Sequence, residues 1–163
     1  MLKAVKQGKI PLARGTFAIV ASRYNARYVD AMLLAAKAEL KRAGVQVIRI
    51  VRVPGAFEIP VVAAVLAHAT RGTHRARPAA IICLGVILRG ETTHADHIGR
   101  EVSRALMDIQ LAEEIPIIHE VLLLENEAQA RARCLGRKHN RGREAAQTAL
   151  AMARVMAGVR EPA

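Results

Sequence analysis

Short apolar runs alternate along this chain with stretches in which apolar residues recur every three or four positions. The runs at 17–22 and 79–84, FAIVAS and AAIICL, are almost free of polar residues. Such runs are typical of parallel strands that are covered on both faces. Two further runs, at 45–53 and 116–124, also predict strands because they are short, rich in β-branched residues and bounded by turn residues.

Helical spacing separates these runs and predicts five helices. At 27–43 the apolar residues fall three or four apart with charged residues between them, and Gly44 follows as a C-terminal stop. Pro60 falls in the first turn of the second helix, where its missing N–H group does no harm. The predicted helices cover 27–43, 56–70, 94–114, 126–135 and 140–157.

The predicted order β-α-β-α-β-α-β-α-α indicates an α/β protein with a parallel sheet and helices on both faces. Neither an internal repeat nor a low-complexity linker interrupts the 163 residues. We therefore expect one domain over 1–163, with 1–14 as an N-terminal arm that could add to a neighbouring subunit. No run approaches the roughly 18 apolar residues of a membrane helix, so we expect no membrane association.

Composition adds a strong positive charge to this picture. The net charge of +11 permits nucleic-acid binding, but it equally suits anionic substrates or a basic assembly. The segment 131–143 holds six basic and no acidic residues, a pattern typical of a solvated helix face and loop in which one or two residues could bind an anion. Because no nucleic-acid recognition signature accompanies it, nucleic acid is the weaker hypothesis.

The cysteines and the N-terminus suggest a location. Cys83 and Cys134 are far apart and predict neither a disulfide framework nor a zinc knuckle. The first residues lack the apolar segment of a secretory signal. A reducing cytoplasm is therefore the expected compartment.

Two of the four aromatic residues fall where a ligand is expected. In open parallel sheets, ligands bind beyond the carboxyl ends of the strands. Tyr24 and Phe57 follow the first and second predicted strands. A flat ring system would use such side chains as platforms. The alternative is that both rings simply close the core.

The segment 89–97, RGETTHADH, carries the richest chemistry. Gly90 allows close backbone approach, and Thr93 with Asp96 predicts a capped helix start whose N–H groups could hold phosphate. His94 can exchange protons near neutral pH. The alternative is a purely structural helix start with a surface histidine. His94 and His97 could also form a metal pair, but no third ligand is evident.

Four sequence motifs follow one another along the chain: SRYN, VPGAFEIP, GVILRGETTH and LLEN…GRKHNRGREAA. Together they resemble the 6,7-dimethyl-8-ribityllumazine synthases over 17–156. The resemblance implies a flavodoxin-like three-layer sandwich with a four-stranded parallel sheet. It also implies condensation of 5-amino-6-(D-ribitylamino)uracil with 3,4-dihydroxy-2-butanone 4-phosphate in riboflavin biosynthesis, without a metal or organic cofactor.

The resemblance further implies residue roles. It makes His94 the catalytic proton carrier, and it assigns the phosphate to Glu91, Thr92 and Arg133. It assigns the pyrimidine and the ribityl chain to Tyr24, Ala56, Phe57, Glu58, Val86, Ile87 and Leu88. One position departs from the family pattern, because His119 stands where the family often has phenylalanine. An imidazole can stack on a pyrimidine, but it adds a titratable group.

The resemblance also implies partners. Members of this family form homopentamers, some of which build sixty-subunit icosahedral shells, and their sites lie between neighbouring subunits. We therefore expect Arg133 and His119 to face a neighbour's Tyr24 and His94. The short turn at 136–142 favours a shell, and riboflavin synthase is a candidate partner. An inactive shell protein of the same fold is an alternative.

Overall fold

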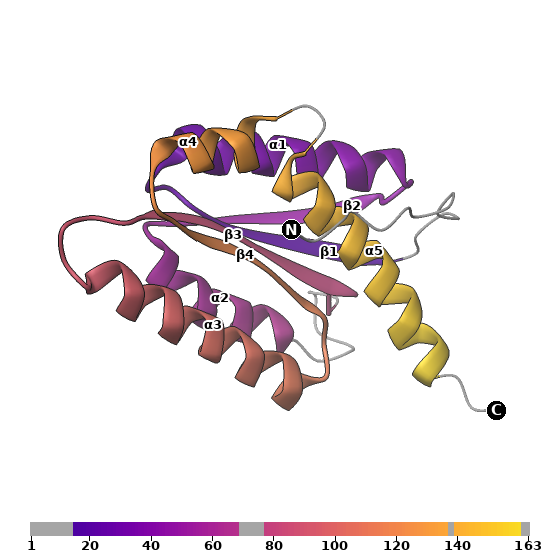
Figure 1. The fold of residues 1–163 in the computed structure, drawn as a ribbon. Coiled ribbons are helices and arrows are strands. Elements are labelled where there is room, and N and C mark those ends of the chain that lie inside the picture. The colour runs from indigo at the N-terminus through magenta and orange to yellow at the C-terminus, as the bar shows by residue number, and fades with distance from the viewer. Residues whose placement is uncertain (1–14, 69–76, 137–138, 161–163) are drawn as a thin grey trace.

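Four parallel strands form the centre of the molecule, in the order β2-β1-β3-β4 (Figure 1). This computed structural model describes residues 15–68, 77–136 and 139–160. The strands are β1 (Thr16–Ser22), β2 (Val47–Val53), β3 (Ala80–Leu88) and β4 (Ile117–Leu124). The predicted four-stranded parallel sheet is therefore confirmed.

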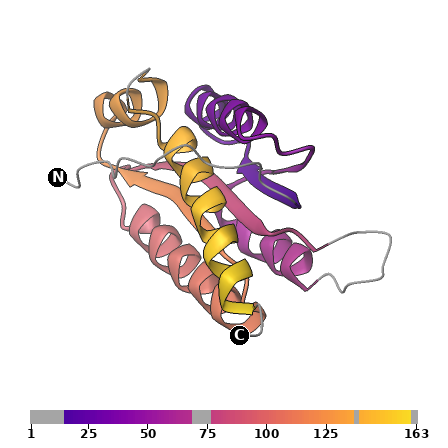
Figure 2. The same ribbon diagram turned by 90° about the vertical axis from the view of Figure 1, so that its right-hand side faces the viewer.

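Helices cover both faces of this sheet, as predicted (Figures 1 and 2). One face carries α1 (Ala26–Arg42), the short α4 (Glu127–Ala130), a π-helix (Arg131–Leu135) and α5 (Arg141–Arg160). The other carries a 3₁₀ turn (Ala56–Glu58), α2 (Ile59–Ala67) and α3 (His94–Glu113). Each face has its own hydrophobic core, and the sheet separates the two cores. None of the helices in the described residues is both long and apolar enough to cross a membrane.

Strand β3 is longer than predicted. The sequence suggested an end at Leu84, but the strand continues to Leu88. Its last residues stay paired with β4, with Gly85 opposite Val121 and Leu88 opposite Leu124. The partner strand, which local periodicity does not reveal, therefore decides where β3 ends. The extension carries 86–88 to the carboxyl edge of the sheet.

Two predicted helices also differ in detail. The helix expected at 56–70 starts as the 3₁₀ turn and becomes α-helical at Ile59, with Pro60 in its first turn as predicted. The helix expected at 126–135 is α-helical only over its first turn and then widens into the π-helix. The second helix also ends earlier than predicted, at Ala67 with His68 as its C-cap, whereas the predicted arm at 1–14 lies outside the described residues.

Both cysteines are buried in the core of the protein. Cys83 and Cys134 have no exposed surface, and burial raises the pKa of Cys83 to about 12 and that of Cys134 to about 11. Because the thiolate is the reactive form, we expect neither thiol to react with Ellman's reagent in the folded protein. Both should react once guanidinium unfolds the chain. Rapid labelling of the native protein would contradict this prediction.

Candidate active site

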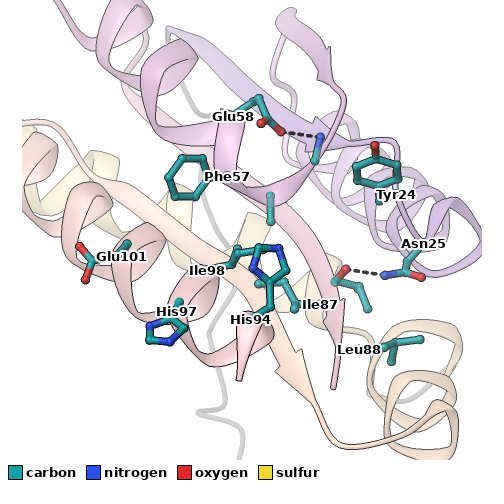
Figure 3. Close-up of a pocket in the computed structure, with 13 residues that line it drawn as sticks. Tyr24, Asn25, Phe57, Glu58, Ile87, Leu88, His94, His97, Ile98 and Glu101 are labelled. Carbon is teal, nitrogen blue, oxygen red and sulfur yellow. Dashed lines mark hydrogen bonds between the residues drawn. The ribbon is translucent and has the colours of Figure 1, made fainter. Parts of the chain in front are cut away.

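A cavity of about 580 Å³ lies at the carboxyl edge of the sheet, within the size range of small-molecule sites. Tyr24 follows β1, and the 3₁₀ turn Ala56–Glu58 follows β2. The end of β3 supplies 86–88, and α3 begins with His94. Figure 3 shows the His94 ring near the middle of this group, with Phe57 and Tyr24 on either side of it in that view.

The two aromatic rings at the cavity do not close the core. Tyr24 is 70% exposed and Phe57 is 61% exposed, whereas the buried aromatic residues are Phe17 and Tyr28. The structural alternative for Tyr24 and Phe57 is therefore wrong. Their exposed faces are available as platforms for a flat ring.

Asn25 holds the edge of the cavity together. Its backbone is left-handed, with φ 56° and ψ 40°, a conformation that asparagine tolerates better than most residues. Its side-chain amide donates a 2.7 Å hydrogen bond to the carbonyl oxygen of Val86 (Figure 3). Asn25 therefore fastens the turn after β1 to the end of β3. The SRYN motif contains this residue, but its role becomes visible only with the left-handed turn and the hydrogen bond to Val86.

The loop after β2 is closed by Glu58. One carboxylate oxygen accepts a 2.8 Å hydrogen bond from the backbone N–H of Gly55. A Cβ atom at Gly55 would lie 2.9 Å from that carboxylate and 3.0 Å from the Tyr24 ring, so only glycine fits without movement. A carboxylate can accept further hydrogen bonds, and the exposed Glu58 side chain suits the hydroxyl groups of a polyol.

The start of α3 differs from the prediction. Thr93 occupies the N-cap position, but its side chain makes no capping hydrogen bond. Asp96 does not reach back to the helix start, because it pairs with Arg89 instead. The predicted capping box is therefore wrong. The first-turn N–H groups lack the expected cap from Thr93, although the Thr92 hydroxyl accepts a 3.4 Å hydrogen bond from the His94 backbone N–H. The start of the helix still suits an anion.

Four of the predicted site residues do not line the cavity. Glu91 and Thr92 lie in the exposed turn just before His94. His119 pairs with Cys83, five residues before the carboxyl end of β4, or about 17 Å along the strand. Arg133 is exposed on the π-helix, on the α1 and α5 face of the sheet, whereas α3 lies on the other face.

The family model of 6,7-dimethyl-8-ribityllumazine synthase matches residues 14–157. The chain belongs to this family. A lumazine synthase from Xanthomonas campestris pv. campestris (strain B100) is 38% identical over 152 residues, which is 92% of this chain and 95% of the relative. Those of Xanthomonas oryzae pv. oryzae (strain PXO99A) and Xylella fastidiosa (strain M12) are each 40% identical over 148 residues, covering 90% of this chain and 91% or 92% of the relative.

His119, the departure from the lumazine synthase pattern, is held by hydrogen bonds at both ring nitrogens. Nδ1 accepts from the backbone N–H of Val121 at 3.2 Å, and Nε2 lies 2.7 Å from the Ser103 hydroxyl. That hydroxyl also bonds the carbonyl oxygen of Gly99 at 2.7 Å, so the network fits a neutral ring with its proton on Nε2. Partial burial lowers the pKa of His119, which favours the same neutral form.

The metal-pair alternative gains no further ligand. His94 and His97 both line the cavity. Within the part of the chain that the structure describes, no three His, Cys, Asp or Glu side chains gather where they could hold a metal ion.

Proposed function

We propose that this chain is a lumazine synthase, which condenses 5-amino-6-(D-ribitylamino)uracil with 3,4-dihydroxy-2-butanone 4-phosphate. The products are 6,7-dimethyl-8-ribityllumazine, phosphate and water. The observation that carries the proposal is the cavity of a member of this family, in which His94 lies among two exposed aromatic rings and the polar Glu58. A flat pyrimidine, its ribityl chain and a proton carrier would meet there.

The cavity suits the order of the bond changes. The amine of the pyrimidine attacks the ketone and forms an imine, with loss of the ketone oxygen as water, and the phosphate then leaves. The ribitylamino nitrogen closes the second ring with loss of water. His94 would carry protons between these steps, and the aromatic residues and the end of β3 would hold the pyrimidine.

Phosphate departure calls for an anion site. Glu91 and Thr92 belong to the turn that precedes α3, and the N-terminus of that helix favours negative charge. Arg133 would supply the positive charge. Because it lies across the sheet from α3, we propose that it reaches the cavity of a neighbouring subunit, together with His119.

Membership of the family implies small-molecule substrates and an oligomeric assembly. We propose that the chain forms a homopentamer. Assembly of pentamers into a sixty-subunit shell and association with riboflavin synthase are two further proposals. The separation of Arg133 and His119 from the cavity of their own chain supports sites between subunits. Sedimentation velocity distinguishes a pentamer from a shell. A cytoplasmic location and a single domain stay predictions.

The direct test is to mix the purified protein with both substrates and to follow lumazine formation by absorbance. We expect a rate above the uncatalysed condensation that is proportional to protein concentration. An assembled protein without that rate would support the inactive shell alternative. Salt-sensitive binding to random oligonucleotides, without lumazine formation, would support the nucleic-acid alternative.

Replacing Arg133 with alanine should weaken binding of the phosphorylated substrate. Loss of a charge-assisted hydrogen bond costs about 1.5–3 kcal/mol, so KM for the butanone phosphate should rise roughly 10- to 100-fold. The matched control is Arg131→Ala on the same π-helix, because Arg131 pairs with Glu127 at 3.1 Å within its own subunit. An unchanged KM in the Arg133 variant would rule out the proposed role.

A further inference from the structure

The guanidinium of Arg89 holds two carboxylates at the edge of the candidate site. Nη1 and Nη2 donate to the two oxygens of Asp96, at 2.6 and 2.7 Å. Nε lies 2.8 Å from an oxygen of Glu125. The backbone N–H of Arg89 also donates to the carbonyl oxygen of Leu124 at 2.9 Å. One side chain therefore joins the end of β3, the first turn of α3 and the residue that follows β4.

This arrangement does not suit Arg89 to binding the phosphate itself. Its three donor nitrogens face two carboxylates, and hydrogen bonds from Arg89 lower the pKa of Asp96 so that its carboxylate stays charged. An added anion would meet two negative charges and only one positive charge. Arg133, by contrast, is exposed on the π-helix, in a segment of basic residues.

The contacts of Arg89 instead hold the first turn of α3, through Asp96. Asp96 follows His94 by two residues, in the same first turn of the helix. Thr93 makes no side-chain cap, and the one local side-chain contact among the described residues of this turn is the 3.4 Å hydrogen bond from the His94 N–H to the Thr92 hydroxyl. A Cβ atom at Gly90 would meet nothing within 4 Å, whereas Ala95, one residue after His94, is buried in the core beneath α3. Besides this apolar contact of Ala95, the ion pairs of Arg89 join the first turn of α3 to the residues that follow β3 and β4.

We propose that Arg89 is a positioning residue of the reaction, which holds Asp96 and Glu125 so that His94 stays aimed into the cavity. The proposal rests on the proposed lumazine synthase function. The same contacts keep the N-terminal N–H groups of α3 in a fixed position for the departing phosphate. Tyr24, Phe57 and Glu58 lie on other elements, and residues 86–88 are held by the pairing of β3 with β4, so the pyrimidine site does not depend on the Arg89 side chain in this way.

The planar fork of arginine is essential to this role. A lysine keeps the positive charge but offers a single nitrogen, which cannot make the bidentate contact with Asp96 while also reaching Glu125. Asp96→Asn keeps the size of the side chain and loses the charged pair. Arg89→Lys and Asp96→Asn should therefore lower kcat as Arg89→Met does, but by a smaller factor, because each variant removes fewer of the contacts.

The test measures kcat and both KM values for Arg89→Met, Arg89→Lys and Asp96→Asn. We expect kcat to fall about 10- to 100-fold in Arg89→Met, because displacement of a catalytic group by about 1 Å can cost 100-fold. The lysine and asparagine variants should show smaller losses of kcat, and KM for the pyrimidine should be unchanged in all three. Arg104→Met is the matched control on α3, since Arg104 makes only exposed pairs at 3.7 and 3.9 Å.

Hydrogen exchange provides a readout that does not need activity. Amides at 92–97 should exchange faster in the Arg89 and Asp96 variants than in the wild type, while those of β1 and β3 stay protected. If the wild type forms no lumazine, the proposed function fails, and exchange still tests the contacts. If the wild type is active and Arg89→Met keeps its kcat, or raises KM for the pyrimidine as much as it lowers kcat, the positioning role is overturned. Should Arg89→Met fail to fold, Arg89→Lys and Asp96→Asn decide by the same criteria.

Discussion

Replacing His94 with alanine is expected to lower kcat for lumazine formation by about 100-fold. One positioned proton carrier contributes typically 10²- to 10⁴-fold, and the low end applies because holding two substrates together supplies much of the acceleration. The His94 ring lies in the cavity, whereas the aromatic platforms come from the loops after β1 and β2. KM for the pyrimidine should therefore change little.

Steady-state kinetics with both substrates checks this expectation. The control is His68→Ala, because His68 is an exposed histidine at the end of α2 that pairs with Glu113 at 3.2 Å, away from the cavity. Two outcomes would contradict the assigned role. One is an unchanged kcat, and the other is complete loss of activity with intact ligand binding, which would require more than one proton carrier's contribution.

Replacing Gly142 with alanine should be the most damaging single-methyl change in the described fold. Helix α5 crosses α1 at this glycine, where an added Cβ would lie 2.0 Å from the carbonyl oxygen of Met32 and 2.5 Å from its carbonyl carbon. Because both atoms belong to the backbone, no side-chain rotation relieves the contact. The helices would have to separate and lose packing around Met32. Overpacking costs typically 1–3 kcal/mol, and we expect about 3 kcal/mol or more here.

The same helix offers the control. A Cβ at Gly158 would meet nothing within 4 Å, so Gly158→Ala should be neutral or should stabilise by up to about 1 kcal/mol through helix propensity. Urea unfolding at one protein concentration compares the variants, because the stability of an oligomer depends on concentration. A Gly142→Ala protein as stable as Gly158→Ala would show that the two helices can separate at little cost.

The sequence predicts the sheet and its helices well, because both leave periodic signals. The apolar run that begins at Phe17 and the helical spacing that ends at Gly44 could be seen without any tertiary information. The end of β3 and the π-helix could not. The first depends on how far β4 continues beside it, and the second is marked by no glycine or proline at 126–135.

The candidate site, like the fold, is only partly predictable from the sequence. Tyr24, Phe57 and His94 were predicted at one edge because the carboxyl ends of parallel strands meet there. Asp96 was assigned to a local cap, whereas it pairs with Arg89. The sequence pattern is the same whether Asp96 caps the start of its own helix or pairs with Arg89 at the end of the preceding strand. The roles of Arg133 and His119 stay predictions, because a single chain does not bring either to the cavity.

The position of Arg133 across the sheet from α3 has a genetic consequence under the proposed assembly. Each subunit would serve two catalytic centres, its own through His94 and a neighbour's through Arg133. A subunit with a defective histidine would still be a useful neighbour. Two alleles that are each inactive alone, one altered at His94 and one at Arg133, could then complement each other in mixed particles. Conversely, subunits from a single defective allele would reduce the catalytic activity of the wild-type subunits beside them.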